Sequence, residues 1–122
     1  YRKVARSEAT VNKLKRNIRL SEKIKSIHNH RCQVCDIRLD SPVGPIAIGA
    51  HIRGLGRPHE GPNVLENMLC LCPNHHVMFD RGTIWIDEDY IVQPIGTQLL
   101  GLDVNPLSQR HIKYHRAQII VE

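Results

Sequence analysis

The sequence predicts a small α+β domain in which helices at both ends flank a middle region of loops and short strands. Three observations support this fold class. Apolar residues recur at helical spacing near both termini, and five of the seven prolines lie between residues 31 and 82. Two Cys/His pairs with the spacing of zinc ligands also bracket that middle region. A chain of 122 residues suffices for one domain and is too short for two ordinary cores.

The composition excludes several classes of protein. Hydrophobic residues make up 41% of the chain, which is too many for a disordered protein. No apolar stretch approaches the roughly 20 residues that cross a bilayer, so a membrane protein is excluded. The first residues, YRKVARSE, show neither an initiator Met nor an apolar signal region, and we expect one domain of a longer protein. Aromatic residues are only 4%, so something besides the core, such as a metal, should stabilise the fold.

Residues 7–29 are expected to form two helical pieces. Two sets of apolar residues repeat at helical spacing, with a phase slip near Ser21 between them: Val11, Leu14, Ile18 and Leu20, Ile24, Ile27. Ser7 and Ser21 are the expected N-caps. This end is strongly basic, because residues 1–31 carry a net charge of +8 and residues 32–122 a net charge of −3. The asymmetry indicates a polyanion such as nucleic acid as partner, and the alternative is an ordinary solvated helix face.

The middle region should contain two strands and a short helix. Residues 46–52 alternate well enough to form a strand, and the apolar run 68–71 could pair with it. After Pro73 the sequence fits a short helix with proline in its first turn, ended by Arg81-Gly82. Residues 83–86 and 90–93 should then form a hairpin. A last amphipathic helix is expected from Asn105-Pro106 to about Ala117.

Two pairs of residues have the sequence spacing of ligands in a closed metal site. Cys32 and Cys35 are three positions apart, and so are Cys72 and His75. Such pairs on tight turns let two ligands reach one tetrahedral ion from each side, which predicts a structural Zn²⁺ site that joins distant segments.

Cys70 competes with Cys72 for that role. The two are separated by one residue, Cys70 lies on the expected strand, and we interpret it as a buried small hydrophobe. Two disulfides are the alternative to zinc, and they require an oxidising compartment that nothing in the sequence indicates.

Four motifs together resemble a known nuclease family: C-Q-V-C at 32–35, G-A-H-I-R at 49–53, N-x4-C-P-N-H-H at 67–76 and F-D-R-G at 79–82. They resemble the HNH endonucleases, which have the ββα-metal fold, in the form that carries zinc-binding Cys pairs. More narrowly, the chain resembles the HNH domain of modification-dependent restriction enzymes, in segments 41–45, 55–59, 61–62, 69–76 and 113–115. In those enzymes an SRA domain that reads methylated cytosine precedes the nuclease, so the resemblance implies a base-reading domain outside this chain.

The resemblance assigns three catalytic residues. His51 would be the general base that activates the attacking water, and an imidazole suits this role because it is largely neutral at physiological pH. Asn67 would hold the loop that carries His51 through hydrogen bonds to backbone. His76 would bind a catalytic divalent ion, Mg²⁺ or another metal, while the neighbouring His75 binds zinc.

One position departs from the family pattern. Many HNH enzymes carry Asp or His directly before the base, as a second ligand of the catalytic ion, whereas this chain has Ala50. The second ligand is therefore left open. Arg53 and Arg57, in the loop between the base and Asn67, are expected to contact DNA phosphates, with ordinary loop charges as the alternative.

We expect the chain to be a metal-dependent DNA endonuclease domain that cleaves double-stranded DNA as part of a modified-cytosine-dependent restriction enzyme. Residues 1–30 would form a basic helical arm, in which Lys13, Lys15 and Arg16 contact DNA, and residues 31–122 the nuclease domain. Within that domain the core would be 31–86, with a hairpin and helix in 87–122. A homodimer and a prokaryotic cytoplasm follow from the resemblance. The alternative function is a zinc-stabilised DNA-binding module without catalytic activity.

Overall fold

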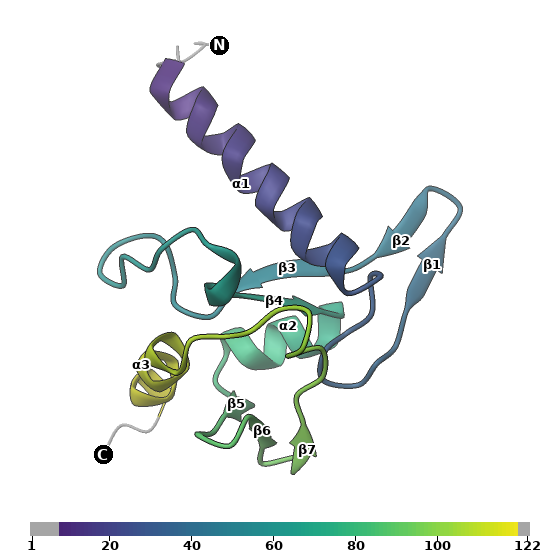
Figure 1. The fold of residues 1–122 in the computed structure, drawn as a ribbon, viewed down its shortest axis with the longest axis vertical. Coiled ribbons are helices and arrows are strands. Elements are labelled where there is room, and N and C mark those ends of the chain that lie inside the picture. The colour runs from purple at the N-terminus through teal and green to yellow at the C-terminus, as the bar shows by residue number, and fades with distance from the viewer. Residues whose placement is uncertain (1–7, 120–122) are drawn as a thin grey trace.

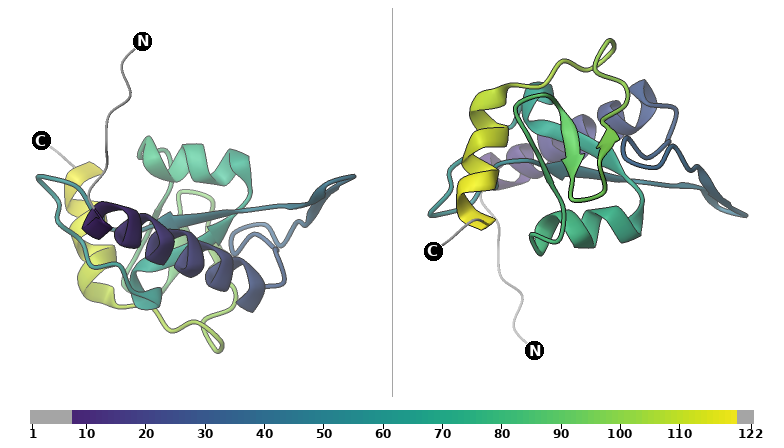
Figure 2. Two further views of the ribbon diagram at one scale, coloured as in Figure 1. Left: turned by 90° about the horizontal axis from the view of Figure 1, so that it is seen from above. Right: turned by 90° about the horizontal axis from the view of Figure 1, so that it is seen from below.

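The computed structural model describes residues 8–119 and has the expected α+β architecture. Its centre is an antiparallel hairpin of β3 (Ile48–His51) and β4 (Met68–Leu71), which pairs Ile48 with Leu71 and His51 with Met68. Helix α1 (Glu8–Ile27) crosses one face of this hairpin and α2 (Pro73–Asp80) lies against the other (Figures 1 and 2). None of the described helices is long and apolar enough to cross a membrane.

The alternation of β4 explains the two faces of the hairpin. Met68 and Cys70 are fully buried together with Ile24 of α1, whereas Leu69 and Leu71 belong to the larger core. Because successive strand residues point to opposite faces, all four residues of β4 are buried between the two helices. The expected pairing of 68–71 with the preceding strand is confirmed, and so is the interpretation of Cys70 as a buried hydrophobe.

The expectation of two N-terminal helical pieces is wrong, because α1 is continuous through Ser21. The apolar phase changes there because the helix changes its surroundings. Its second half lies on the hairpin at Gly49, where a Cβ would come within 2.8 Å of the Ser21 Oγ and 2.9 Å of the Ile24 side chain. Residues 8–16 and Ile18 are exposed to solvent. The proposed N-cap Ser7 lies outside the described residues.

The expected strand 46–52 is two strands in the structure. Residues up to Ile46 belong to β2 (Gly44–Ile46), which forms a separate hairpin with β1 (Leu39–Ser41) that the sequence did not predict. Ala47 interrupts the run, and β3 begins at Ile48. Short apolar alternation does not show where one ladder ends and another begins, since both have the same period of two residues.

The C-terminal part covers the larger core. The expected hairpin is confirmed as β5 (Trp85–Ile86) and β6 (Ile91–Gln93), and a third strand, β7 (Thr97–Gln98), extends it. Helix α3 (Gln109–Ile119) begins four residues later than Asn105. Asn105 is instead buried, and its Nδ2 donates to the Met68 carbonyl oxygen at 3.1 Å, which holds this segment against the hairpin before the helix begins.

Candidate active site and metal centre

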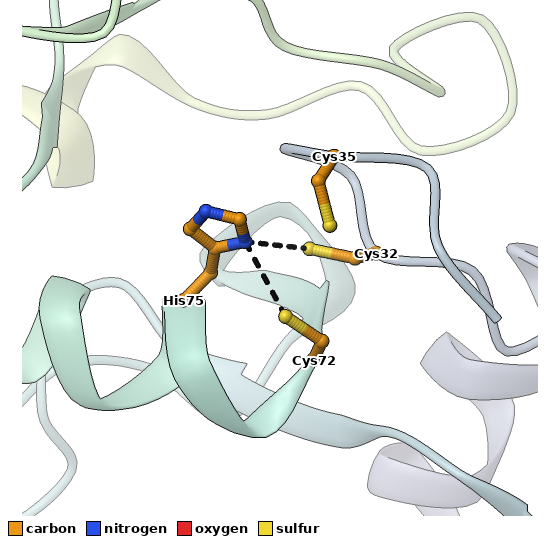
Figure 3. Close-up of side chains that lie close together, drawn as sticks. All are labelled: Cys32, Cys35, Cys72 and His75. Carbon is orange, nitrogen blue, oxygen red and sulfur yellow. Dashed lines mark hydrogen bonds between the residues drawn. The ribbon is translucent and has the colours of Figure 1, made fainter. Parts of the chain in front are cut away.

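Four side chains from two distant segments converge beside the start of α2 (Figure 3). The ligand atoms of Cys32, Cys35, Cys72 and His75 all lie within 4.8 Å of one another. His75 Nδ1 is 3.5 Å from Cys32 Sγ and 3.3 Å from Cys72 Sγ. A nitrogen and a sulfur on one tetrahedral ion would be about 3.6 Å apart, so the cluster has the dimensions of a closed metal site. The four cysteines are all free, and the cluster could hold a metal ion.

Gln33 holds the turn that carries the first pair of candidate ligands, Cys32 and Cys35, in position. It is 1% exposed, its backbone N–H donates to the Cys70 carbonyl oxygen, and its Oε1 accepts from the Cys70 N–H, each at 2.9 Å. On its other side Gln33 Nε2 donates to the Leu100 carbonyl oxygen at 2.8 Å. These bonds hold the Cys32–Cys35 turn next to the end of β4, where Cys72 follows. The sequence contained no signal for this role of Gln33.

Burial changes the acidity of two cysteines, Cys32 and Cys70. It raises the pKa of Cys32 to about 12 and that of Cys70 to about 11. Cys70 has no ligand partner in the cluster, whereas Cys32 lies against His75. A metal that bound the cluster would therefore displace a proton from Cys32.

His51 ends β3 and is only partly buried. Its Nε2 lies 2.9 Å from Asn63 Oδ1, and no hydrogen bond joins its Nδ1 to any of the described residues. Since an amide oxygen can only accept, the proton of the neutral ring is on Nε2. The lone pair of Nδ1 is then available to take a proton. Sequence reasoning did not identify Asn63 as a partner of His51.

Asn67 is fully buried and holds the loop that follows His51. Its Oδ1 accepts from the Arg53 N–H at 2.8 Å, and its Nδ2 donates to the carbonyl oxygens of Arg53 and Pro62 at 2.9 and 2.8 Å. The side chain thus joins the beginning and the end of the loop between β3 and η1 (Leu65–Asn67). These contacts use every donor and acceptor group of the amide.

His76 lies one helical turn before Asp80 on α2, and its Nε2 is 3.1 Å from Asp80 Oδ2. Asp80 lines a cleft of about 530 Å³ together with His51. Ala50 is 4% exposed and packs in the larger core, so it contributes no polar group. Asp80 is thus a carboxylate that lies beside His76 and lines the cleft of His51, and its spacing of four residues from His76 was the signal in the sequence that could have found this pair.

Helix α3 also lines the cleft, with Tyr114 and His115. The Tyr114 hydroxyl is 2.8 Å from His59 Nδ1, and the Arg53 guanidinium lies 4.1 Å above the Tyr114 ring. Burial lowers the pKa of His115, which stacks on Phe79 at a ring distance of 3.8 Å and donates from Nε2 to the Phe79 carbonyl oxygen. The contact with Tyr114 therefore holds the Arg53 side chain beside the cleft, in the loop that follows His51.

The other cations expected to contact DNA differ in their surroundings. Arg16 lines a shallow groove with Arg19, Lys23 and Asn63, the residue bonded to His51. Lys13 and Lys15 are exposed on α1 outside this groove. The Arg57 side chain is 93% exposed and lies 3.9 Å from Glu60. The structure therefore places Arg16 in a groove that the His51 partner Asn63 also lines, and it leaves Lys13, Lys15 and Arg57 on the surface.

The comparisons agree with this geometry. Residues 32–87 match the family model of the HNH endonucleases. Among solved structures, the modification-dependent TagI restriction endonuclease is 46% identical, with a TM-score of 0.73 over 84% of this chain. No curated protein matches the chain.

The chain therefore contains an HNH endonuclease domain, with the fold that its motifs predicted. It spans 38% of the length of the TagI chain.

Proposed function

We propose that this chain cleaves double-stranded DNA by metal-dependent hydrolysis of a phosphodiester bond, as the cleavage module of a modified-cytosine-dependent restriction enzyme. The observation that carries the proposal is the shared cleft of His51 and Asp80. A base with a free Nδ1 and a carboxylate paired with a histidine are the groups that this hydrolysis needs.

His51 acts as the general base in this proposal. With its proton held on Nε2 by Asn63, the ring takes a proton from water at Nδ1 while the water attacks phosphorus. Asn67 holds the loop beyond the base through its three hydrogen bonds, so that the ring faces the phosphate in a defined position.

His76 and Asp80 would hold the catalytic ion. The imidazole of His76 and the carboxylate of Asp80 lie side by side, with Nε2 3.1 Å from Oδ2, so the two side chains could bind one ion together. A bound divalent ion would neutralise the scissile phosphate and the charge that develops on the leaving 3′ oxygen.

We assign Zn²⁺ to the Cys32/Cys35/Cys72/His75 cluster. Three thiolates and one imidazole are a donor set typical of structural zinc, and all four tetrahedral positions are filled by protein atoms. The ion would join the turn after α1 to the start of α2, next to His76. Zinc therefore supports the active site without taking part in the chemistry.

Basic side chains around the cleft would bind the phosphates of the duplex. Arg53 would do so from the Tyr114 ring, which lines the cleft, and Arg16 from the groove that Asn63 also lines. Lys13, Lys15 and Arg57 would add non-specific attraction from the surface. We propose residues 1–30 as a basic segment that contributes to DNA binding and residues 31–122 as the nuclease domain.

The TagI enzyme is a modification-dependent restriction endonuclease, which supports the finer assignment. By analogy, a base-reading domain of the SRA type would belong to the complete protein. One active site cuts one strand, so we propose that two copies act together for a double-strand break. Four free cysteines fit a reducing prokaryotic cytoplasm.

Cleavage of supercoiled plasmid in Mg²⁺, Mn²⁺ or EDTA tests the proposal. The chain should nick the plasmid with a divalent ion and lose activity in EDTA. His51→Ala should lower the rate on the order of 10²- to 10⁴-fold and leave zinc content and DNA binding unchanged. A folded, zinc-loaded protein that binds DNA and never cuts it would instead be the non-catalytic binding module.

A further inference from the structure

A chain of two hydrogen bonds connects His51 to the basic helix α1. His51 Nε2 lies 2.9 Å from Asn63 Oδ1, and Asn63 Nδ2 donates to Asn17 Oδ1 at 2.6 Å. The three residues come from the end of β3, the loop before η1 and the middle of α1. Each of them is partly buried, which protects both hydrogen bonds from competition with bulk water.

The two bonds have a defined direction. Asn63 uses its amide nitrogen toward Asn17, so it can present only its oxygen to His51. The oxygen accepts the proton on Nε2, which fixes both the tautomer and the plane of the imidazole ring. If Asn17 were absent, the Asn63 amide could rotate and offer a nitrogen donor to His51, and that would favour the proton on Nδ1.

The packing of α1 determines where Asn17 lies. Asn17 is one turn before Ser21 and two turns before Ile24, so all three residues share one face of the helix. Ser21 and Ile24 are the residues that contact the hairpin at Gly49, two positions before His51. The close approach of helix and strand at this glycine therefore places the Asn17 amide within reach of Asn63.

We infer that Asn17 and Asn63 are positioning residues for the nuclease reaction, and that α1 is part of the catalytic apparatus as well as a basic DNA-binding surface. The inference rests on the proposed role of His51 as general base. Asn63 orients the ring so that Nδ1 faces the attacking water, and Asn17 orients Asn63. This assigns α1 a function that its charge alone does not require.

The test combines nuclear magnetic resonance of the His51 ring nitrogens with single-turnover cleavage by the zinc-loaded 122-residue chain. Wild-type His51 should show a single neutral tautomer with its proton on Nε2. Asn63→Leu removes the acceptor at similar volume, and it should mix the tautomers and lower the cleavage rate constant about tenfold, less than the loss of the base itself. DNA affinity should stay unchanged, because the ring acts in the chemical step.

Variants at position 17 test whether the Asn17 side chain orients Asn63 and, through it, the His51 ring. Asn17→Leu should perturb the His51 ring signals and lower the rate constant, whereas Asn17→Asp retains the acceptor for Asn63 Nδ2 and should keep both close to wild type. Asn12→Leu, at an exposed position of the same helix, is the matched control and should change neither.

A proton on Nδ1 in the wild-type ring would overturn the inference. It would equally be overturned if Asn63→Leu and Asn17→Leu left the ring signals and the rate constant at wild-type values. The ring signals report the hydrogen bonds whether or not DNA is cut. A wild-type protein that shows the Nε2 tautomer and cleaves nothing would therefore contradict the proposed function, while the structural part of the inference would stand.

Discussion

Replacing Asn67 by alanine should destabilise the domain and misplace its base at the same time. The side chain is fully buried and makes three hydrogen bonds to the backbone of Arg53 and Pro62. At about 1 kcal/mol for each bond, Asn67→Ala should lower the free energy of unfolding by about 3 kcal/mol. A domain of this size has roughly 5–15 kcal/mol in total, so the loss is large but leaves a folded protein.

The effect on cleavage should exceed the effect on stability. Arg53 follows His51 by two residues, and without Asn67 the loop loses its connection to Pro62. A displacement of the reacting groups by about 1 Å costs on the order of 10²-fold in rate. Asn67→Asp keeps the acceptor for the Arg53 N–H but places a carboxylate against two carbonyl oxygens, so it should destabilise at least as much as alanine.

Urea unfolding of the zinc-loaded protein and single-turnover plasmid cleavage measure the two effects. Asn74→Ala is the control, because Asn74 is exposed on α2, and its free energy of unfolding should stay within about 0.5 kcal/mol of wild type. If Asn67→Ala lost less than about 1 kcal/mol and still cleaved at the wild-type rate, the three hydrogen bonds would not be what holds the loop.

Two further predictions concern the metal centre and the basic helix. His75→Ala should lose zinc and unfold the domain, because the binding energy of a structural ion is folding energy. His76→Ala should stay folded with about one zinc per chain and lose cleavage. Metal analysis and thermal unfolding distinguish the two variants, and the opposite result would mean that His76 binds zinc and His75 the catalytic ion. Neutralising Lys13, Lys15 and Arg16 should weaken DNA binding equally for all sequences and flatten its dependence on salt, and an unaltered salt slope would show that these charges only solvate the helix.

Most of the fold was predictable because its signals are local. The pairing of 68–71 with the preceding strand, the helix after Pro73 and the hairpin near residues 85–93 each follow from alternation or from the position of a proline. By contrast, the different environments of Cys70 and Cys72 do not follow from the period of a strand, which places residues two apart on one face. They arise because β4 ends at Leu71: Cys70 lies under α1, whereas Cys72 is the N-cap of α2 and lies against His75.

Errors arose where a tertiary contact outweighed a local pattern. The apolar phase slip at Ser21 suggested a break, but a helix tolerates a change of face when its second half lies on a hairpin and its first half does not. Asn105-Pro106 resembled a helix start, but the Asn105 side chain is used to bond the Met68 carbonyl oxygen, and α3 begins only at Gln109.

The sequence by itself indicated the kind of chemistry, because the spacing of its motifs singled out His75 and His76 as candidate metal ligands and His51 as a candidate base. The two adjacent histidines lie on one short helix, so their separation is set by helical geometry before any packing occurs. Only the tertiary structure decided how His51 is held. Asn17, His51 and Asn63 are far apart in the chain, and no periodicity relates them. Their meeting depends on how closely α1 approaches the hairpin at Gly49, which is a property of the packed fold.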